Sequence, residues 1–132
     1  MAEPSFRFVC VPDALAGAPS GWAQEMLRDG EIALLAGGEG LDAINAVAHD
    51  LGLMSVPLVR GEESTPRQEQ TVMAYAENLP LVWVSSAFGD GATVWARDRG
   101  PMTLLVPADG PLSEDERRRI ERFVATLGRQ SE

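Results

Sequence analysis

Residues 31–52, EIALLAGGEGLDAINAVAHDLG, combine three structural signals in a row. The apolar run Glu31–Ala36 has the length of a β-strand, and a glycine-rich stretch interrupts it. Apolar residues then recur at helical spacing, and Gly52 is a natural helix stop. A strand that passes through a glycine turn into an amphipathic helix is the repeating unit of parallel α/β sheets.

The same alternation extends to both sides of this segment. Upstream, Phe6–Val11 has the pattern of a strand, and a short helix from Trp22 ends before Gly30. Downstream, residues 53–59 form another apolar run, and Pro57 predicts that this strand lies at a sheet edge or bends there. A helix from Thr65 follows, and Leu81–Ser85 is apolar on both faces, as in a central strand.

The C-terminal third predicts a different arrangement. Thr93–Arg97 and Met102–Val106 have the composition of two strands, and Asp98–Pro101 between them resembles a tight turn. We therefore expect an antiparallel hairpin there. A final helix begins at Ser113, where Ser113 and Glu116 have the spacing of a capping box.

The predicted fold is therefore a single α/β domain spanning residues 1–132. It has three layers, with a mostly parallel central sheet between helices, a C-terminal antiparallel hairpin and a last helix.

The glycine turn also predicts a candidate ligand site. Gly38, Gly40 and Ala43 fit the pattern G-x-G-x-x-G/A, in which glycines let the backbone approach a pyrophosphate at a helix N-terminus. Glu62 lies about 20 residues further on, where an acid would bind a ribose hydroxyl. Over about thirty residues the passage resembles Rossmann-like nucleotide-binding folds. Glu39 and Asp42 oppose this hypothesis, because they place negative charge where the phosphates would lie.

Composition restricts the function further. The net charge of −9 argues against nucleic-acid and anionic-membrane partners. The chain has arginine but no lysine, which argues against P-loop and Schiff-base chemistries that depend on a lysine. A single cysteine, a single histidine and an N-terminus unlike a signal peptide favour a cytoplasmic protein with no metal. We expect no cofactor, unless the glycine turn binds a nucleotide.

The leading functional hypothesis is a non-enzymatic interaction or accessory domain that binds a protein partner or a second copy of itself. Trp95, Arg97 and Arg99 are the expected interface residues, because tryptophan and arginine are frequent in protein interfaces. Strand addition at a sheet edge is one possible binding mode. Nucleotide binding is the alternative, and a small hydrolase using Ser86, Asp90 or His49 is a third possibility.

Overall fold

The computed structural model describes residues 5–15, 18–19, 21–28, 30–35, 41–51, 58–59, 65–108 and 110–130. Helices and strands alternate along the chain. The strands are β1 (Phe6–Cys10), β2 (Gly30–Leu35), β3 (Leu58–Val59), β4 (Leu81–Ser85) and β5 (Thr103–Pro107). The helices are η1 (Pro12–Leu15), α1 (Trp22–Met26), α2 (Leu41–Leu51), α3 (Thr65–Ala76), α4 (Asp90–Arg99), η2 (Gly100–Met102) and α5 (Glu114–Gln130), of which η1 and η2 are short 3-10 turns.

The five strands form one sheet in the order β3-β2-β1-β4-β5, and every pair is parallel. The strand order reverses between β1 and β4, which is the arrangement of doubly wound sheets. The register places Phe6 beside Gly30 and Leu81 beside Thr103. The outer strands are β3 and β5. The strand predicted over residues 53–59 is therefore confirmed at a sheet edge for its described residues, Leu58 and Val59.

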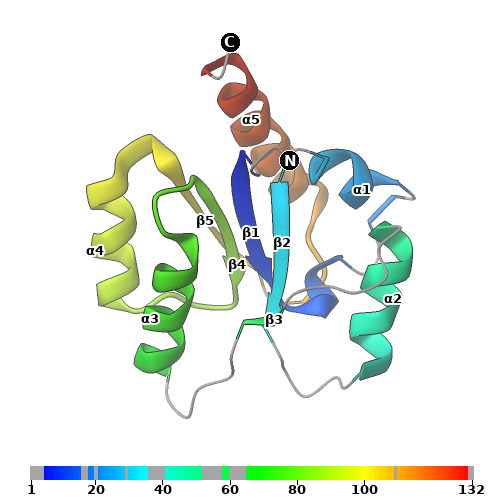
Figure 1. Ribbon diagram of the computed structural model, residues 1–132, viewed down its shortest axis with the longest axis horizontal. Coiled ribbons are helices and arrows are strands. Elements are labelled where there is room, and N and C mark those ends of the chain that lie inside the picture. The colour runs from blue at the N-terminus through cyan, green and yellow to red at the C-terminus, as the bar shows by residue number, and fades with distance from the viewer. Residues whose placement is uncertain are drawn as a thin grey trace.

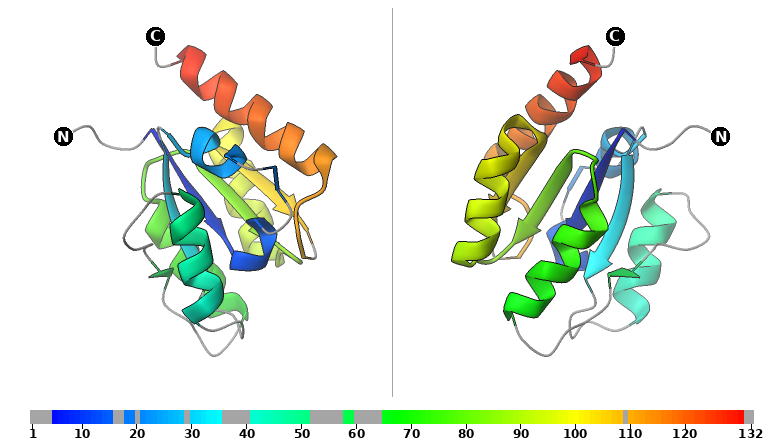
Figure 2. Two further views of the ribbon diagram at one scale, coloured as in Figure 1. Left: turned by 90° about the vertical axis from the view of Figure 1, so that its right-hand side faces the viewer. Right: turned by 60° about the vertical axis from the view of Figure 1, so that its left-hand side comes forward.

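The sheet lies between two helical layers, and Figure 1 shows it nearly edge-on with α3 and α4 on one side and α1 and α2 on the other. One core contains Phe6, Phe8 and Leu34 from the sheet together with side chains of α1, α2 and α5. The second core contains Val9 and Trp83 from the opposite face, with side chains of α3 and α4. Figure 2 shows that α5 crosses the face that it shares with α1 and α2. The α/β class is therefore confirmed, with helices on both faces.

The predicted C-terminal hairpin is wrong. The segment Thr93–Arg97 belongs to the helix α4, and only Thr103–Pro107 is a strand. Because β5 pairs with β4 in the parallel direction, the chain needs a crossover between them, and α4 supplies it. The turn predicted at Asp98–Pro101 is the end of that helix, where Gly100 adopts a φ of 65°.

Tertiary packing explains why α4 is helical although its residues favour strands. Thr, Val and Trp are common in strands, so local composition misleads at positions 93–95. However, Ala92 and Ala96 are four residues apart and both are buried against the sheet. Asp90 in the first turn and Arg97 and Arg99 in the last also suit the helix dipole.

The predicted capping box of α5 is confirmed. The Glu116 backbone N–H donates to Ser113 Oγ at 3.2 Å, and the Ser113 N–H donates to Glu116 Oε1 at 2.8 Å. The helix packs through Ile120 and Leu127, both of which are buried. The cap and this apolar stripe fix where α5 begins and which face it buries.

Candidate functional site

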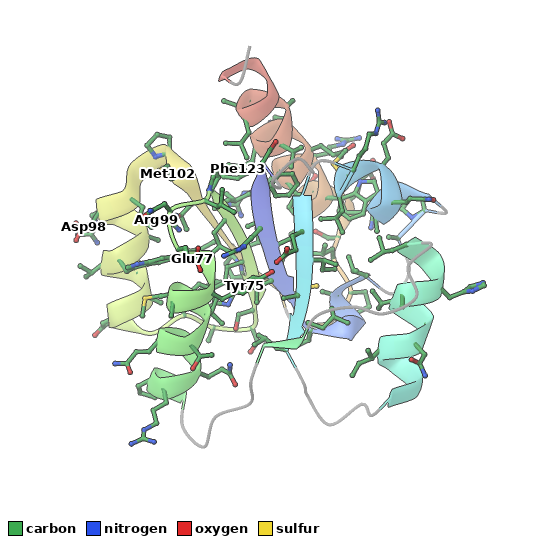
Figure 3. The ribbon with its side chains drawn as sticks, viewed as in Figure 1. Tyr75, Glu77, Asp98, Arg99, Met102 and Phe123 are labelled. Atoms are coloured by element: carbon green, nitrogen blue, oxygen red, sulfur yellow. The ribbon has the colours of Figure 1, made fainter. Side chains whose placement is uncertain are left out.

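The three predicted interface residues all lie on α4, at the end nearest the start of β5. Arg97 is exposed, whereas Trp95 and Arg99 are half-buried. Figure 3 shows Arg99 reaching toward the sheet while Asp98 points away from it. Arg97 is therefore open to solvent, whereas Trp95 and Arg99 are packed against the rest of the protein. The sequence analysis placed this segment on a strand and could not make that distinction.

Trp95 belongs to an aromatic cluster between α4 and the sheet. Its ring meets that of Trp83 edge-to-face, with the ring centroids 6.4 Å apart, and Phe88 contacts the same Trp83 ring at 5.2 Å. The Arg99 guanidinium lies 4.5 Å from the Trp95 ring centroid, within the range of a cation–π contact. Trp95 and Arg99 therefore attach α4 to the sheet, in addition to any contact with a partner.

Arg99 also connects α4 to the segment between α3 and β4. Its Nη2 donates to the Leu79 carbonyl, while Nη1 is buried and has no hydrogen-bond partner among the described residues. Burial lowers the pKa of Arg99 from its usual value, because desolvation disfavours the charged form.

A second polar cluster lies at the amino ends of β1 and β2, on the same face as α3. Arg7 contacts Glu31 at 3.6 Å and Glu77 at 3.8 Å, donates to the Tyr75 carbonyl, and lies 4.6 Å from the Tyr75 ring centroid. The Tyr75 hydroxyl donates to Glu31 Oε1 at 2.5 Å. Figure 3 shows Tyr75 and Glu77 together at this end of α3. The sequence analysis missed this cluster because its members come from separate elements of the chain. The local signals were a single charged residue in each of two apolar strands, Arg7 in β1 and Glu31 in β2.

This cluster predicts a loss of stability in alkali. Burial and the hydrogen bond to Glu31 raise the pKa of Tyr75 above that of an unfolded tyrosine. A raised folded-state pKa gives stability that is complete below about pH 10 and is lost as the pH rises further. Tyr75 is the only tyrosine, so tyrosinate absorbance reports this residue alone. We expect Tyr75 in the native protein to remain un-ionised near pH 10. We also expect Tyr75→Phe to lose less folding stability than the unaltered chain as the pH rises above 10. Ionisation of native Tyr75 at the usual tyrosine pKa would contradict both expectations.

The carboxyl ends of the strands, where ligands bind in doubly wound sheets, carry acidic groups. Glu69 of α3 is 7% exposed and accepts a hydrogen bond from the Gly89 N–H at 2.7 Å. Asp90 follows in the first turn of α4, and the Ser85 hydroxyl donates to the Ala87 carbonyl at 3.0 Å. A phosphate at the N-terminus of α4 would therefore meet two carboxylates, which makes this position unsuitable for an anion.

The residues predicted to bind a nucleotide are only partly described. Gly38, Gly40 and Glu62 lie outside the described residues. Ala43 lies in α2, and its side chain is also outside the description. Because the glycine turn follows β2, it is one strand away from the reversal between β1 and β4.

The described part of the chain offers few other candidates for a binding or catalytic site. A cavity of about 300 Å³ lies between the η1–α1 segment and α2, and among the described residues that line it Gln24 alone has a polar side chain. No group of three or more His, Cys, Asp or Glu residues among those described could hold a metal ion. His49 is exposed on α2, and Cys10 is fully buried, which raises the pKa of its thiol. None of the described helices could cross a bilayer, judged by length and apolar character.

The outer edge of β5 is the feature with the greatest potential for binding. Residues Thr103–Pro107 carry no charge, and β5 pairs only with β4 in the described sheet. The Ala108 N–H donates to the Ser85 carbonyl at 2.9 Å, so even-numbered residues direct their backbone groups toward β4. The N–H and C=O groups of Thr103 and Leu105 consequently point outward. Pro107 also lies on this outer side, where its missing N–H costs no ladder hydrogen bond.

Comparisons of the chain with protein-family models, curated proteins and solved structures find no match.

Proposed function

We propose that this chain is a non-enzymatic interaction domain of the cytoplasm that binds an extended protein segment along the outer edge of β5. The supporting observation is the uncharged strand Thr103–Pro107 at the end of the sheet, with outward N–H and C=O groups at Thr103 and Leu105. Proteins usually protect such an edge with charges, proline, bulges or a covering element, because it is a template for another strand. On β5 only the last position, Pro107, has such protection, and Thr103 and Leu105 keep their outward N–H groups. An edge without charge therefore favours strand addition.

The predicted interface residues have separate roles in this proposal. Arg97 is exposed on α4 beside the edge and is available to a partner. Trp95 and Arg99 hold α4 in place through their contacts with Trp83 and the Leu79 carbonyl. Substitutions at Trp95 are therefore expected to affect stability as well as association.

A labelled peptide with the sequence of residues 101–108, PMTLLVPA, tests the proposal directly. We expect saturable binding to the folded chain, followed by fluorescence anisotropy, and at least about tenfold weaker binding to Leu105→Pro, which lacks the outward N–H and adds bulk to the edge. Leu105 donates no hydrogen bond to β4, so this variant should keep the sheet, as circular dichroism can verify. Absence of saturable binding, or equal binding to a folded Leu105→Pro, would reject strand addition.

Nucleotide binding at residues 37–43 is a second candidate, because the strand order β3-β2-β1-β4-β5 is one that nucleotide-binding sheets share. In those sheets the glycine-rich turn follows the first strand, whereas here it follows β2. Gly38, Gly40 and Ala43 would approach the phosphates, and Glu62 the ribose. We expect dinucleotides to raise the melting temperature if this site exists, because a ligand that binds only the folded state stabilises it. An unchanged melting temperature with a large excess of each nucleotide would remove this candidate.

A further inference from the structure

We infer that the segment bound by the β5 edge is the β5 strand of a second copy of this chain, paired antiparallel about a twofold axis at Leu105. This inference rests on the proposed function and names its partner. A twofold interface must be self-complementary, because each surface meets an identical one. Three features of β5 and α4 satisfy that requirement.

The backbone is the first feature. With the axis at Leu105, the two Leu105 residues exchange both N–H···O=C hydrogen bonds, as in a hydrogen-bonded antiparallel pair. Each outward Thr103 N–H then faces the partner's Pro107, whose carbonyl accepts it. Pro107 has no N–H to donate in return, so the Thr103 carbonyl at each end of the pairing is left to water.

The strand side chains are the second feature. Leu104 packs against the core shared with α5, and Leu105 packs against the core shared with α4, yet each remains partly exposed in the single chain. Pairing would cover both leucines at once, one on each face of the extended sheet. Burial of apolar surface contributes about 25 cal/mol per Å², so covering the exposed part of these two leucines favours a paired edge.

The charges of α4 are the third feature. Because β4 and β5 are parallel, the connecting helix α4 runs antiparallel to both strands. Trp95 of α4 contacts Trp83, which pairs with Leu105, so this part of the helix lies beside the middle of β5. Asp90, Thr93 and Arg97 are exposed and lie on one flank of α4, whereas Trp95 and Arg99 turn toward Trp83 and Leu79. The axis at Leu105 brings the two α4 helices together antiparallel, so that Asp90 of each copy faces the partner's Arg97. The helix dipoles also oppose each other favourably in this arrangement.

The net charge of −9 opposes the encounter of two copies, so we expect a reversible dimer whose population depends on concentration. Sedimentation velocity over a dilution series should show the average mass rising from 14.2 kDa toward twice that value. Leu105→Pro should remain monomeric at concentrations where the unaltered chain dimerises.

A charge swap tests the geometry. Asp90→Arg and Arg97→Asp should each weaken self-association by roughly tenfold, because like charges then face each other across the axis. An equimolar mixture of these two variants should regain the dimer, since each heterodimer restores both opposite-charge pairs. Asp98→Arg, an exposed change on the other flank of α4, is the matched control and should not alter association.

The outcomes separate the two proposals. A monomeric chain at all concentrations, or a mixture of the variants that fails to regain the dimer, would overturn the self-pairing. If the labelled peptide still bound in that case, strand addition on β5 would stand with a different partner. If neither the peptide nor a second copy bound, both proposals would be rejected.

Discussion

Replacement of Gly30 with alanine is expected to lower the free energy of unfolding by about 3 kcal/mol, because the new methyl group would overpack a filled site. Gly30 lies beside Phe6 in the parallel register of β1 and β2. A Cβ at Gly30 would lie 2.5 Å from Phe6 Cζ, closer than real Cβ contacts come. The Phe6 ring is 1% exposed and has little space into which it can move. Urea denaturation monitored by tryptophan fluorescence would measure the loss.

Gly91→Ala is the matched control and should change stability in the opposite direction. Gly91 is exposed in the first turn of α4, and a Cβ there would meet no atom within 4 Å. Alanine is favoured over glycine by about 1 kcal/mol in a helix interior and by less in the first turn, so Gly91→Ala should stabilise the protein slightly. A stabilising Gly30→Ala would contradict the packing of Phe6, and a clearly destabilising Gly91→Ala would contradict the helical state of α4.

Truncation of Trp83 to alanine should have the largest effect, a loss of about 3–5 kcal/mol. Trp83 is 2% exposed on β4 and contacts Phe88 from the strand-to-helix connection and Trp95 from α4. Its removal would leave a cavity between the sheet and α4 and remove both edge-to-face contacts. Loss of this support would also release α4, which borders the β5 edge.

Trp83→Phe is a milder variant that tests the packing of Trp83 even if Trp83→Ala does not fold. The indole Nε1 is buried without a hydrogen-bond partner among the described residues, so phenylalanine removes an unsatisfied donor together with some volume. We expect a cost below about 1.5 kcal/mol, well under that of alanine, by chemical denaturation. Equal losses for the two variants would show that the indole donor makes a contact important to folding.

Much of the fold could be predicted from local signals. The bounds of β4 were predicted correctly at Leu81–Ser85, and the Ser113–Glu116 pair located the start of α5. The failure was α4, because its strand-forming residues obscured a helical pair of buried alanines. Whether β5 pairs parallel or antiparallel depends on contacts distant in sequence, and local composition carries little information about them.

The candidate site was predictable only in part, for a related reason. The sequence indicated Trp95, Arg97 and Arg99 as a group, but only the packing of α4 separates exposed Arg97 from the two half-buried residues. The outward direction of the Leu105 backbone follows from the β4–β5 register, which requires the strand order. The Arg7–Tyr75–Glu31 cluster joins residues of β1, α3 and β2, and no local motif connects them.

Residue-by-residue amide hydrogen exchange of β5, followed by NMR at low and high protein concentration, tests the availability of this edge most directly. In dilute protein, the Leu104 and Val106 amides should be protected by β4, while those of Thr103 and Leu105 exchange rapidly. Protection should then appear at Thr103 and Leu105 as the concentration rises. Slow exchange of all four amides at every dilution would mean that the edge is already covered, and rapid exchange of Leu104 and Val106 would mean that β5 does not pair with β4 as described.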